Sequence, residues 1–377
     1  MISFIDLNAQ QASIKEKIDR RIKTVLEHGA YIMGPEVREL EEKLAEFCGA
    51  KHVITCSSGT DALLLPLMAQ NVGRGDAVFV PSFTFVATAE AVSMLGATPV
   101  FVDVLPDTFN MDAHSLKRAV EFAAGQGLKP RVVIPVDLFG QPADYDALQE
   151  VVTEYGLWVL SDSAQGFGSV YKDRRSGTLG RVTATSFFPA KPLGCYGDGG
   201  AVFTDDAEMA QVMRSLRVHG KGNDKYDNVR VGMNARLDTI QAAILLEKLA
   251  IFPDEIAARN RVADRYNEAL RTIVSVPHVI EDARSVWAQY TVKVAATARA
   301  SIMAALKERG VPSVVYYPTP LHRQTAYAHC PIDPDGLPVS EQLAAQVFSL
   351  PMHPYMDDAT QDTVIGQLQE ISTACAA

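Results

Sequence analysis

The segment RVVIPVDLFGQPADYDALQEVVTEYGLWVLSD, residues 131–162, contains a complete strand–helix–strand pattern. Residues 131–136 form an apolar run that is typical of a buried strand. Four residues follow at helical spacing: Tyr145, Leu148, Val152 and Tyr155. Gly156 then supplies a C-terminal stop, and a second apolar run occupies residues 157–161. Two strands joined by a helix predict parallel pairing, with the helix packed on one face of the sheet.

The same alternation of short apolar runs and amphipathic stretches extends from about residue 51 to about residue 210. Seven candidate strands lie in this region: residues 52–56, 77–80, 98–102, 131–136, 157–161, 183–187 and 200–204. This order predicts an α/β fold with a mainly parallel sheet that helices cover on both faces. Ligands of such sheets bind beyond the carboxyl ends of the strands, so we expect the functional residues at that edge.

The sheet pattern fades after residue 210, and a long helical stretch follows. This stretch runs from about Leu237 to Leu270, and Pro253 inside it is expected to break the helix because proline lacks a backbone N–H. The tail carries a strand over residues 288–294, a helix near residues 301–309 and a final helix. We therefore expect a large domain over residues 1–250, N-terminal segment included, and a smaller C-terminal α+β domain over residues 251–377.

The formal net charge of the 377-residue chain is −10, from 35 Lys and Arg residues against 45 Asp and Glu residues. We expect no nucleic-acid partner for so acidic a chain. Hydrophobic residues make up 47% of the sequence, yet no uninterrupted apolar run reaches the length of about 18 residues that a membrane helix needs. We therefore expect a globular protein without a membrane partner.

The start of the chain, MISFIDLNAQQ, lacks the basic region and the apolar run of a signal peptide, and the five cysteines contain no CxxC pair. Both observations favour a reducing, cytoplasmic location. The spacing of a loose group, His322, His329, Cys330 and His353, matches no zinc motif. We therefore expect no metal site.

Residues 57–61, SSGTD, follow a predicted strand and open a predicted helix. Gly59 permits a tight turn, and the hydroxyls of Ser58 and Thr60 lie beside the first amides of the helix, where an anion can bind. Ordinary helix capping by Ser, Thr and Asp is an alternative reading of the same residues. The motif is neither a Walker loop nor a GxGxxG dinucleotide turn.

Two ionisable residues stand at unusual places in the pattern. Asp162 ends the apolar run 157–161, where a carboxylate is either a helix cap or surface residue, or an acid that holds a buried cation. Lys191 follows a predicted strand and the segment FFPA, residues 187–190. Such a setting would desolvate the amine and lower its pKa, which suits a lysine that forms a Schiff base; a solvated lysine is the alternative.

Together these three signals match what pyridoxal phosphate requires. An anion site holds the phosphate, a carboxylate keeps the pyridine nitrogen protonated, and a lysine forms the imine with the aldehyde. Phe85, in the segment PSFTFVAT at residues 81–88, could lie against the pyridine ring, with core packing as the alternative. The combination predicts a pyridoxal 5'-phosphate enzyme.

Seven ordered motifs then extend over the whole chain: GPE (34–36), SGTDAL (58–63), DSAQ (162–165), SFFPAK (186–191), GDGG (197–200), NARLDT (234–239) and YPTPLH (317–322). With them the chain resembles the DegT/StrS-type sugar-nucleotide aminotransferases, a branch of the aspartate aminotransferase fold. This resemblance implies a fold type I, pyridoxal-phosphate-dependent transferase.

The resemblance also implies roles for matching positions. Lys191 would be the Schiff-base lysine and Asp162 the partner of the pyridinium. The other implied cofactor contacts are Gln165 at the ring oxygen, Phe85 over the ring, and Gly59, Thr60 and Ser186 at the phosphate. Asn234 would reach that phosphate from the neighbouring subunit, so the resemblance implies a homodimer with shared active sites. Three further positions resemble substrate contacts: Arg236, Tyr317 and His322.

Within the family, residues 187–200 and the segment SLPMHP at residues 349–354 are most similar to one subgroup. Its members aminate the C3 ketone of UDP-2-acetamido-2-deoxy-3-oxo-glucuronate, with glutamate as the expected donor, for bacterial surface polysaccharides such as O-antigens. The alternative is an aminotransferase for a TDP-3-oxo or 4-oxo hexose. Sugar dehydratases of the same fold have histidine in place of the lysine, so Lys191 argues against them, and a ligand-sensing regulator would need an added DNA-binding domain.

Two positions depart from the family pattern. Many relatives have His where this chain has Asp137, and many have Ala where it has Ser163. The first departure puts any cofactor contact at Asp137 in doubt, while the second leaves Asp162 and Gln165 in place.

Overall fold

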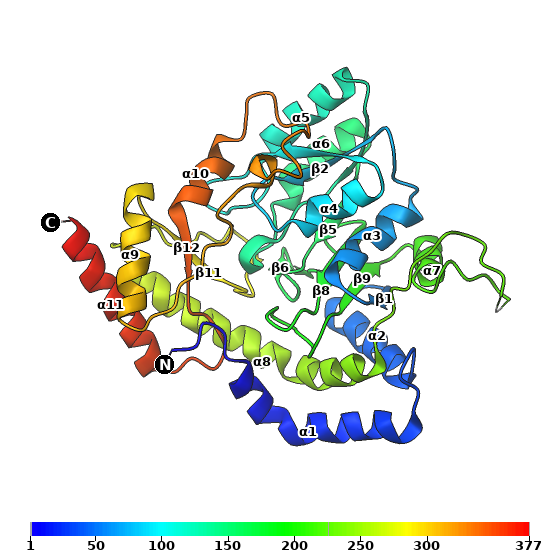
Figure 1. The fold of residues 1–377 in the computed structure, drawn as a ribbon, viewed down its shortest axis with the longest axis horizontal. Coiled ribbons are helices and arrows are strands. Elements are labelled where there is room, and N and C mark those ends of the chain that lie inside the picture. The colour runs from blue at the N-terminus through cyan, green and yellow to red at the C-terminus, as the bar shows by residue number, and fades with distance from the viewer. Residues whose placement is uncertain (1, 225, 377) are drawn as a thin grey trace.

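A seven-stranded sheet forms the centre of the computed structural model, which describes residues 2–224 and 226–376, with side chains as far as residue 372 (Figure 1). In spatial order its strands are β1 (His52–Cys56), β9 (Gly200–Thr204), β8 (Val182–Ser186), β5 (Trp158–Asp162), β4 (Lys129–Val133), β2 (Asp76–Pro81) and β3 (Thr98–Val102). Strand β9 runs antiparallel to both its neighbours, and the other pairs are parallel. The predicted α/β fold with a mainly parallel sheet is confirmed.

The predicted strands are all present, with ends that shift by up to a few residues. The largest shift is in β4, which ends at Val133 rather than at residue 136. The chain stays extended beyond that point, since Ile134 donates its N–H to the Phe79 carbonyl and Asp162 donates its own to the Pro135 carbonyl. Pro135 itself has no N–H to donate, so the ladder of strand hydrogen bonds is interrupted there.

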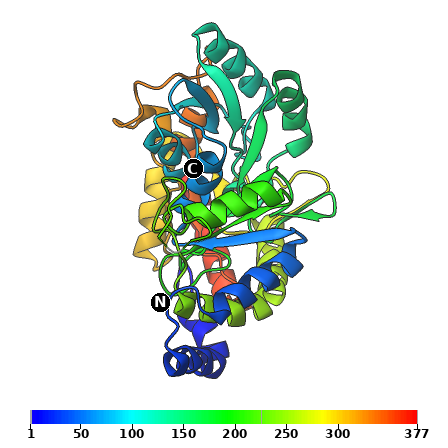
Figure 2. The ribbon, with the colours of Figure 1, turned by 90° about the vertical axis from the view of Figure 1, so that its right-hand side faces the viewer.

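Helices cover both faces of this sheet, as Figures 1 and 2 show. In β2, Val78 and Val80 pack with helices α3, α4 and α7, whereas Ala77 and Phe79 pack with α5 and α6. The bounds of these helices are α3 (Gly59–Ala69), α4 (Ala87–Met94), α5 (Ala113–Gly125), α6 (Tyr145–Tyr155) and α7 (Ala207–Leu216). Alternate residues of a strand point to opposite faces, so a strand that is apolar throughout requires cover on both sides.

Helices α2 (Pro35–Cys48) and α8 (Thr239–Leu270) pack against the β1 and β9 side of the sheet. Helix α1 (Leu7–His28) lies along α8 at the edge of the molecule, where Ile14 and Ile18 contact Ile244 (Figure 1). No helix within the described residues is long and apolar enough to cross a bilayer.

A second apolar core lies beyond the end of the large sheet, around the strand pair β11 (Tyr290–Lys293) and β12 (Val347–Leu350). Helices α9 (Ala296–Glu308), α10 (Pro338–Gln346) and α11 (Asp358–Ala376) belong to this part of the chain. The remaining elements are short: β6 (Val170–Tyr171), β7 (Arg174–Arg175), β10 (Ala283–Arg284), η1 (Leu138–Gly140) and η2 (Leu321–Arg323).

The break that we predicted at Pro253 is wrong, because α8 is one helix of 32 residues. An internal proline costs about 3 kcal/mol, chiefly through the hydrogen bond it cannot donate to the carbonyl four residues earlier. Phe252 and Ile256 on either side are buried in an apolar cluster, and burying one such side chain contributes about 1.5–3 kcal/mol. Packing therefore offsets the proline. The domain boundary near residue 250, which remains a prediction, falls inside this helix.

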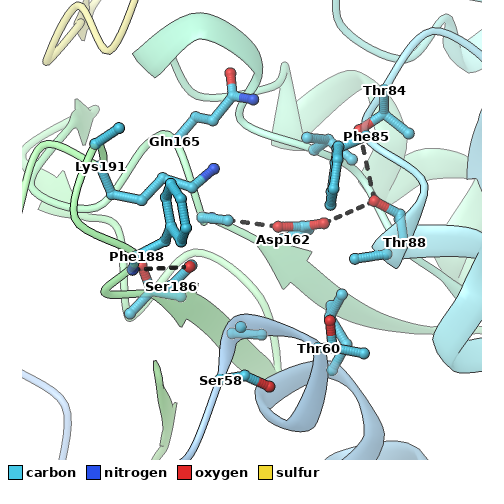
Figure 3. Close-up of a pocket in the computed structure, with 18 of the residues that line it drawn as sticks. Ser58, Thr60, Thr84, Phe85, Thr88, Asp162, Gln165, Ser186, Phe188 and Lys191 are labelled. Atoms are coloured by element: carbon cyan, nitrogen blue, oxygen red, sulfur yellow. Dashed lines mark hydrogen bonds between the residues drawn. The ribbon is translucent and has the colours of Figure 1, made fainter. Parts of the chain in front are cut away.

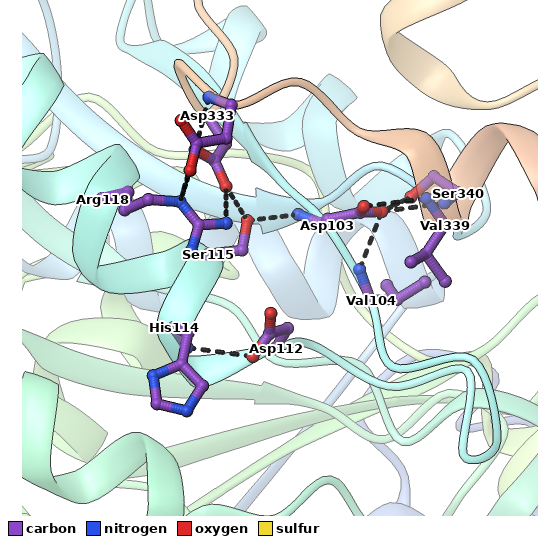
Figure 4. A network of polar contacts seen from close by, with 10 residues as sticks. Asp103, Val104, Asp112, His114, Ser115, Arg118, Asp333, Val339 and Ser340 are labelled. Carbon is purple, nitrogen blue, oxygen red and sulfur yellow. Dashed lines mark hydrogen bonds and ion pairs between the residues drawn. The ribbon is translucent and has the colours of Figure 1, made fainter.

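The segment after Tyr317 leaves the second core, crosses to the large sheet and returns at β12. Asp333, which is fully buried, holds the middle of this segment: it accepts hydrogen bonds from Arg118 Nε (3.0 Å) and from Ser115 Oγ (Figure 4). Asp103 holds its end by accepting from the Ser340 N–H at 2.8 Å. These buried carboxylates fix the segment, and with it the position of Tyr317, relative to the sheet.

Candidate active site

A cavity of about 470 Å³ lies at the carboxyl ends of β5 and β8, the edge predicted to carry function. Eight of the predicted site residues line it: Gly59, Thr60, Phe85, Asp162, Gln165, Ser186, Lys191 and Tyr317. Figure 3 shows how most of their side chains converge on this space. Three others do not line it within a single chain: Asn234, Arg236 and His322.

Asp162 is the last residue of β5 and is buried. Its Oδ2 accepts a hydrogen bond from Thr88 Oγ1 at 2.8 Å, and its Oδ1 accepts from the Ala164 N–H at 3.2 Å (Figure 3). Burial raises the pKa of this carboxyl, and both hydrogen bonds and the charge of Lys191 oppose the rise. No ion pair holds Asp162 among the described residues, so the site has a buried acid that a bound cation would stabilise.

Lys191 extends across the cavity toward Asp162 (Figure 3). Its backbone N–H donates to the Phe188 carbonyl at 2.8 Å, which closes the turn that presents the side chain. Burial lowers the pKa of the amine, and the charge of Asp162 partly reverses the effect. An amine that loses its proton more readily is a better nucleophile and a better base, as predicted from the apolar segment before it.

The N-terminus of α3 forms the floor of the cavity. Ser58 caps the helix by accepting the Asp61 N–H at 3.1 Å, so the capping reading of this motif is correct. The amides at the start of the helix and the dipole still favour an anion there. A Cβ at Gly59 would lie 2.6 Å from Cβ of Ser186, so the glycine is required for β8 to approach this helix end. Capping by Ser58 therefore leaves this turn suited to an anion.

Aromatic side chains form the wall opposite the sheet. Phe85 is 53% exposed within the single chain, and its ring centre lies 6.2 Å from that of Tyr317. An aromatic side chain that stays so exposed inside a cavity is available to cover a flat ligand, which argues against the core-packing reading. Gln165 donates from Nε2 to Tyr317 Oη at 2.9 Å and accepts the Phe139 N–H at 2.8 Å.

His322 lies outside the cavity and is buried elsewhere. Its Nδ1 lies 2.7 Å from Ser82 Oγ, and its Nε2 lies 3.1 Å from a carboxylate oxygen of Glu341. Both ring nitrogens therefore have partners within the fold, where they help to hold the segment that follows Tyr317. A substrate contact at His322 remains a prediction.

A basic stretch precedes α8 in the sequence, and its cations differ in their surroundings; it comprises Arg217, Lys221, Lys225, Arg230 and Arg236. Arg217 is buried and pairs with Glu41 at 2.6 Å, so it serves the fold. Lys221 and Arg230 are exposed, and Lys225 lies outside the described residues. Arg236 donates to Asn234 Oδ1 at 2.5 Å, which places these two predicted contacts side by side at the base of the loop.

Sequence reasoning missed several residues that line the cavity, Thr88 and Tyr316 among them. Thr88 donates the hydrogen bond that orients Asp162, and it lies in the same segment as Phe85. A hydroxyl beside a buried carboxylate is a common arrangement, but its partner lies 74 residues away in the chain, so no local pattern indicated it. Tyr316 directly precedes the predicted Tyr317 and had no signal of its own.

Asp137, one of the two departures from the family pattern, does not line the cavity. It is fully buried behind Asp162, and its Oδ1 accepts from Tyr145 Oη at 2.9 Å and from the Ala143 N–H at 3.1 Å. Its Oδ2 and the hydroxyl of Ser163 are both buried and face each other. A Cβ added at Gly166 would lie 3.1 Å from both atoms, so the two departures are neighbours in space.

Burial raises the pKa of Asp137 to about 7. The folded state therefore binds a proton that the unfolded chain, with a pKa of about 3.9, releases as pH rises. The stability contributed by this proton is complete at low pH and is lost as pH rises through 7. An asparagine side chain at this position would keep the shape without the charge, so we expect Asp137→Asn to gain stability over the parent by roughly 1.4 kcal/mol per pH unit between about pH 4 and 7.

Urea unfolding of the cofactor-free parent and variant at several pH values measures this difference directly. The gain should level off above neutral pH, since Asp137 is then ionised in both states of the parent. Parallel stability curves for the two proteins would contradict the assignment of a buried, protonated carboxyl.

The residues present fit pyridoxal phosphate. The buried acid Asp162 forms no ion pair within the described part of the chain, and a protonated pyridine nitrogen would supply a partner. The helix N-terminus at Gly59 and Thr60 suits a phosphate, and Lys191 carries an amine of lowered pKa in the same cavity. No nicotinamide or metal requirement accounts for these three features together.

Comparisons with known proteins agree with this geometry. Residues 12–369 match the family described as DegT/DnrJ/EryC1/StrS aminotransferases. A UDP-2-acetamido-2-deoxy-3-oxo-D-glucuronate aminotransferase of Pseudomonas aeruginosa is 51% identical over 96% of this chain and 97% of its own. A dTDP-3-amino-3,4,6-trideoxy-alpha-D-glucose transaminase of Streptomyces venezuelae is 37% identical over 98% and 96%.

Solved structures give the same result. An aminotransferase of this family from Brucella abortus superimposes with a TM-score of 0.96 and 52% identity, over 98% of this chain and 99% of its own. A Bacillus subtilis protein solved with bound cofactor PMP has a TM-score of 0.89 and 30% identity, over 99% and 85%. The matches extend over nearly the whole chain, and the range of the family match contains Asp162 and Lys191. The chain therefore belongs to the DegT/DnrJ/EryC1/StrS aminotransferase family.

Proposed function

We propose that this protein transfers an amino group from glutamate to the C3 ketone of a UDP-linked 2-acetamido-3-oxo-uronic acid, with pyridoxal 5'-phosphate as cofactor. The observation that carries the aminotransferase chemistry is the pair of Lys191, with its lowered pKa, and the buried Asp162 in one cavity beside a helix N-terminus. The choice of sugar is supported by the 51% identity to an enzyme named for that reaction.

The cofactor, when bound, supplies an electron sink for the carbanion that proton removal creates. Asp162 would hold a positive charge at the ring nitrogen, which the burial of this carboxylate would make favourable. Lys191 would be the base that accepts the α-carbon proton of the amino donor, and the acid that donates a proton when the sugar is aminated. Phe85, Phe188 and Tyr317 line the cavity with aromatic rings, which would limit the access of water once a ligand covers them.

The second candidate is a TDP-linked 3-oxo or 4-oxo hexose, and the 37% identity to the dTDP-sugar transaminase supports it. The two candidates differ in the charge of the sugar, because a uronic acid carries a carboxylate. Arg236 is our choice for the residue that binds this carboxylate, since a planar guanidinium can donate two parallel hydrogen bonds. Its Nε is buried without a hydrogen-bond partner, so it has a donor to offer.

The experiment that tests the substrate is a panel of UDP- and TDP-keto sugars offered with glutamate, the amino sugar being identified by mass and NMR. We expect amination of the UDP-uronate at C3. Arg236→Lys should lower kcat/KM for the uronate by about ten- to a hundredfold, the usual cost of a lost charge-assisted contact. The matching neutral 6-hydroxymethyl sugar should lose far less. Equal losses on both sugars would place Arg236 at the diphosphate or in the fold.

We also propose that the active unit is a homodimer with shared active sites. Asn234 is exposed and does not line the cavity of its own chain, which a phosphate contact from a partner subunit would explain. The loop before it projects from the body of the chain (Figure 1) and carries Val229 and Val231, which are 53% and 89% exposed. Exposed apolar residues on a projecting loop favour burial against a second copy.

Mixing two inactive proteins tests the shared site. A Lys191→Ala chain and a chain with Asn234→Ala should each have little activity, whereas hybrid dimers contain one site with both residues intact. We expect mixing to restore up to about a quarter of the parent activity, as random assortment of the subunits gives. A fully active Asn234→Ala protein, or a mixture with no activity, would argue against sharing.

The biosynthetic role of the reaction follows from its proposed product. A diamino uronic acid linked to UDP is a building unit for bacterial surface polysaccharides such as O-antigens, and the family resemblance supports that destination. We propose that the enzyme works in the cytoplasm, where glutamate and UDP-sugars are both present.

A further inference from the structure

Gln289 is a polar residue in the cavity to which no role has been assigned. It directly precedes β11, lines the same cavity as Lys191 and is only 9% exposed. Its Oε1 is buried and has no hydrogen-bond partner, and within the described residues its side-chain amide makes no hydrogen bond. A buried amide without partners costs stability, so its presence needs an explanation.

The backbone around Gln289 is held firmly in place. Its N–H donates to the Phe139 carbonyl at 3.3 Å, and Phe139 in turn donates its N–H to Gln165 Oε1. Gly140, which follows Phe139, has a φ of +113°. It lets the loop that contains Phe139 come close to the segment before β11, because a Cβ at Gly140 would lie 2.6 Å from the backbone nitrogen of Trp287. The loop that positions Gln165 therefore also positions Gln289.

The rest of the lining shows what this amide can offer. Gln165 already uses both ends of its side chain, on Phe139 and on Tyr317. Lys191 is the single cation among the described residues that line the cavity, and it is needed for the chemistry. Gln289 is thus the amide in the cavity that remains available to a substrate.

We propose that Gln289 binds both substrates in turn, a role that rests on the function proposed above. Transamination brings an amino acid and a keto sugar into one cavity, one after the other. The Nε2 of Gln289 donates to a carboxylate of the amino donor. Its Oε1 accepts from an O–H or N–H on a sugar carbon next to the ketone. An amide presents either a donor or an acceptor by turning its last bond, whereas an arginine offers donors alone.

The test measures the two half-reactions separately, by following cofactor absorbance with glutamate and then with the UDP-uronate. Gln289→Met keeps the volume and removes both polar atoms. We expect kcat/KM to fall about 10- to 100-fold with glutamate, whose carboxylate makes a charged hydrogen bond, and about 3- to 10-fold with the sugar. Gln289→Glu keeps the acceptor but sets a negative charge in direct contact with the carboxylate of glutamate, whereas the carboxylate of the uronate is on a carbon that is not next to the ketone. Its loss with glutamate should therefore exceed its loss with the sugar by at least about tenfold.

Thermal unfolding of the cofactor-free proteins supplies a readout independent of turnover. Removing an amide without partners should leave Tm unchanged or raise it in Gln289→Met. Gln361→Met is the matched control: Gln361 is also buried but donates to the Val262 carbonyl at 2.7 Å, and it lies in α11, outside the cavity. The control should lower Tm and leave both half-reactions unchanged.

Three results would overturn the proposal. The first is a kcat/KM of Gln289→Met within about twofold of the parent in both half-reactions, and the second is a drop in its Tm as large as that of Gln361→Met. The third is an equal loss of kcat/KM in the two half-reactions of Gln289→Glu. If the parent enzyme aminates a different sugar, the second half-reaction is measured with that sugar instead of the uronate. The half-reaction with glutamate is measured unchanged. Failure of the proposed substrate thus appears in the parent, and failure of the Gln289 assignment appears in the ratio of variant to parent.

Discussion

Replacement of Lys191 by alanine is expected to reduce turnover by about 10⁴-fold, the upper end of what a positioned acid–base group contributes. The loss should be this large because we propose that the same amine is both the nucleophile that holds the cofactor and the group that moves the proton. The absorption band of the lysine-bound cofactor should disappear as well. Steady-state kinetics with glutamate and the UDP-uronate, together with a visible spectrum, measure both effects.

Lys191→Arg is the sharper companion to this variant. It retains a cation beside Asp162, but a guanidinium stays protonated at all working pH values and can neither attack the aldehyde nor accept a proton. Lys51→Ala, at an exposed position before β1, controls for the loss of any lysine. Turnover of Lys191→Ala at the rate of that control would remove Lys191 from the mechanism.

Replacement of Asp162 by asparagine is expected to slow the proton-transfer step by about 10²–10³-fold, the usual cost of removing one group that stabilises charge in the transition state. The buried carboxylate has no ion-pair partner among the described residues and is oriented by Thr88 and the Ala164 N–H. An amide in its place cannot neutralise a protonated ring nitrogen, so the ring withdraws fewer electrons from the carbanion. Single-turnover measurements with glutamate isolate this step.

Thr88→Val provides a graded comparison, because it removes one hydrogen bond from Asp162 and leaves the charge. Its effect should be about three- to tenfold, in line with one lost hydrogen bond. A rate for Asp162→Asn equal to that of the parent would show that the acid only caps the end of β5. A larger effect for Thr88→Val than for Asp162→Asn would show that the hydroxyl, and not the carboxylate, matters.

The spacing of apolar residues was sufficient to predict the sheet. Every predicted strand is present, since a strand buried on both faces must be apolar throughout, and that property is visible in the residues themselves. The same reasoning failed at Pro253, where a local rule predicted a break in α8. Burial of Phe252 and Ile256 outweighs that rule, and burial by distant elements cannot be read from the neighbouring residues.

In the site, the sequence identified residues whose chemistry is unusual for their position. Each can be recognised from a few neighbouring residues: Asp162 at a strand end, Lys191 after an apolar segment and Gly59 before a helix. All three line the cavity. Arg217 shows the limit of this approach. It lies in the same basic stretch as Arg236, yet its pairing with Glu41 removes it from the site. Charge alone does not distinguish a cation that binds substrate from one that supports the fold.

The sequence by itself therefore determined the fold class and the cofactor, and it singled out Asp162 and Lys191, which both line the cavity, because these inferences depend on periodicity and on residue type at strand and helix ends. Only the tertiary structure decided which other groups surround them. Thr88 orients Asp162 from 74 residues away in the sequence. Gln289 lines the cavity from the position before β11, and its side-chain amide has no hydrogen-bond partner among the described residues. Such contacts arise where separate elements pack together, and a polar residue has no local sign of which partner, if any, the fold will give it.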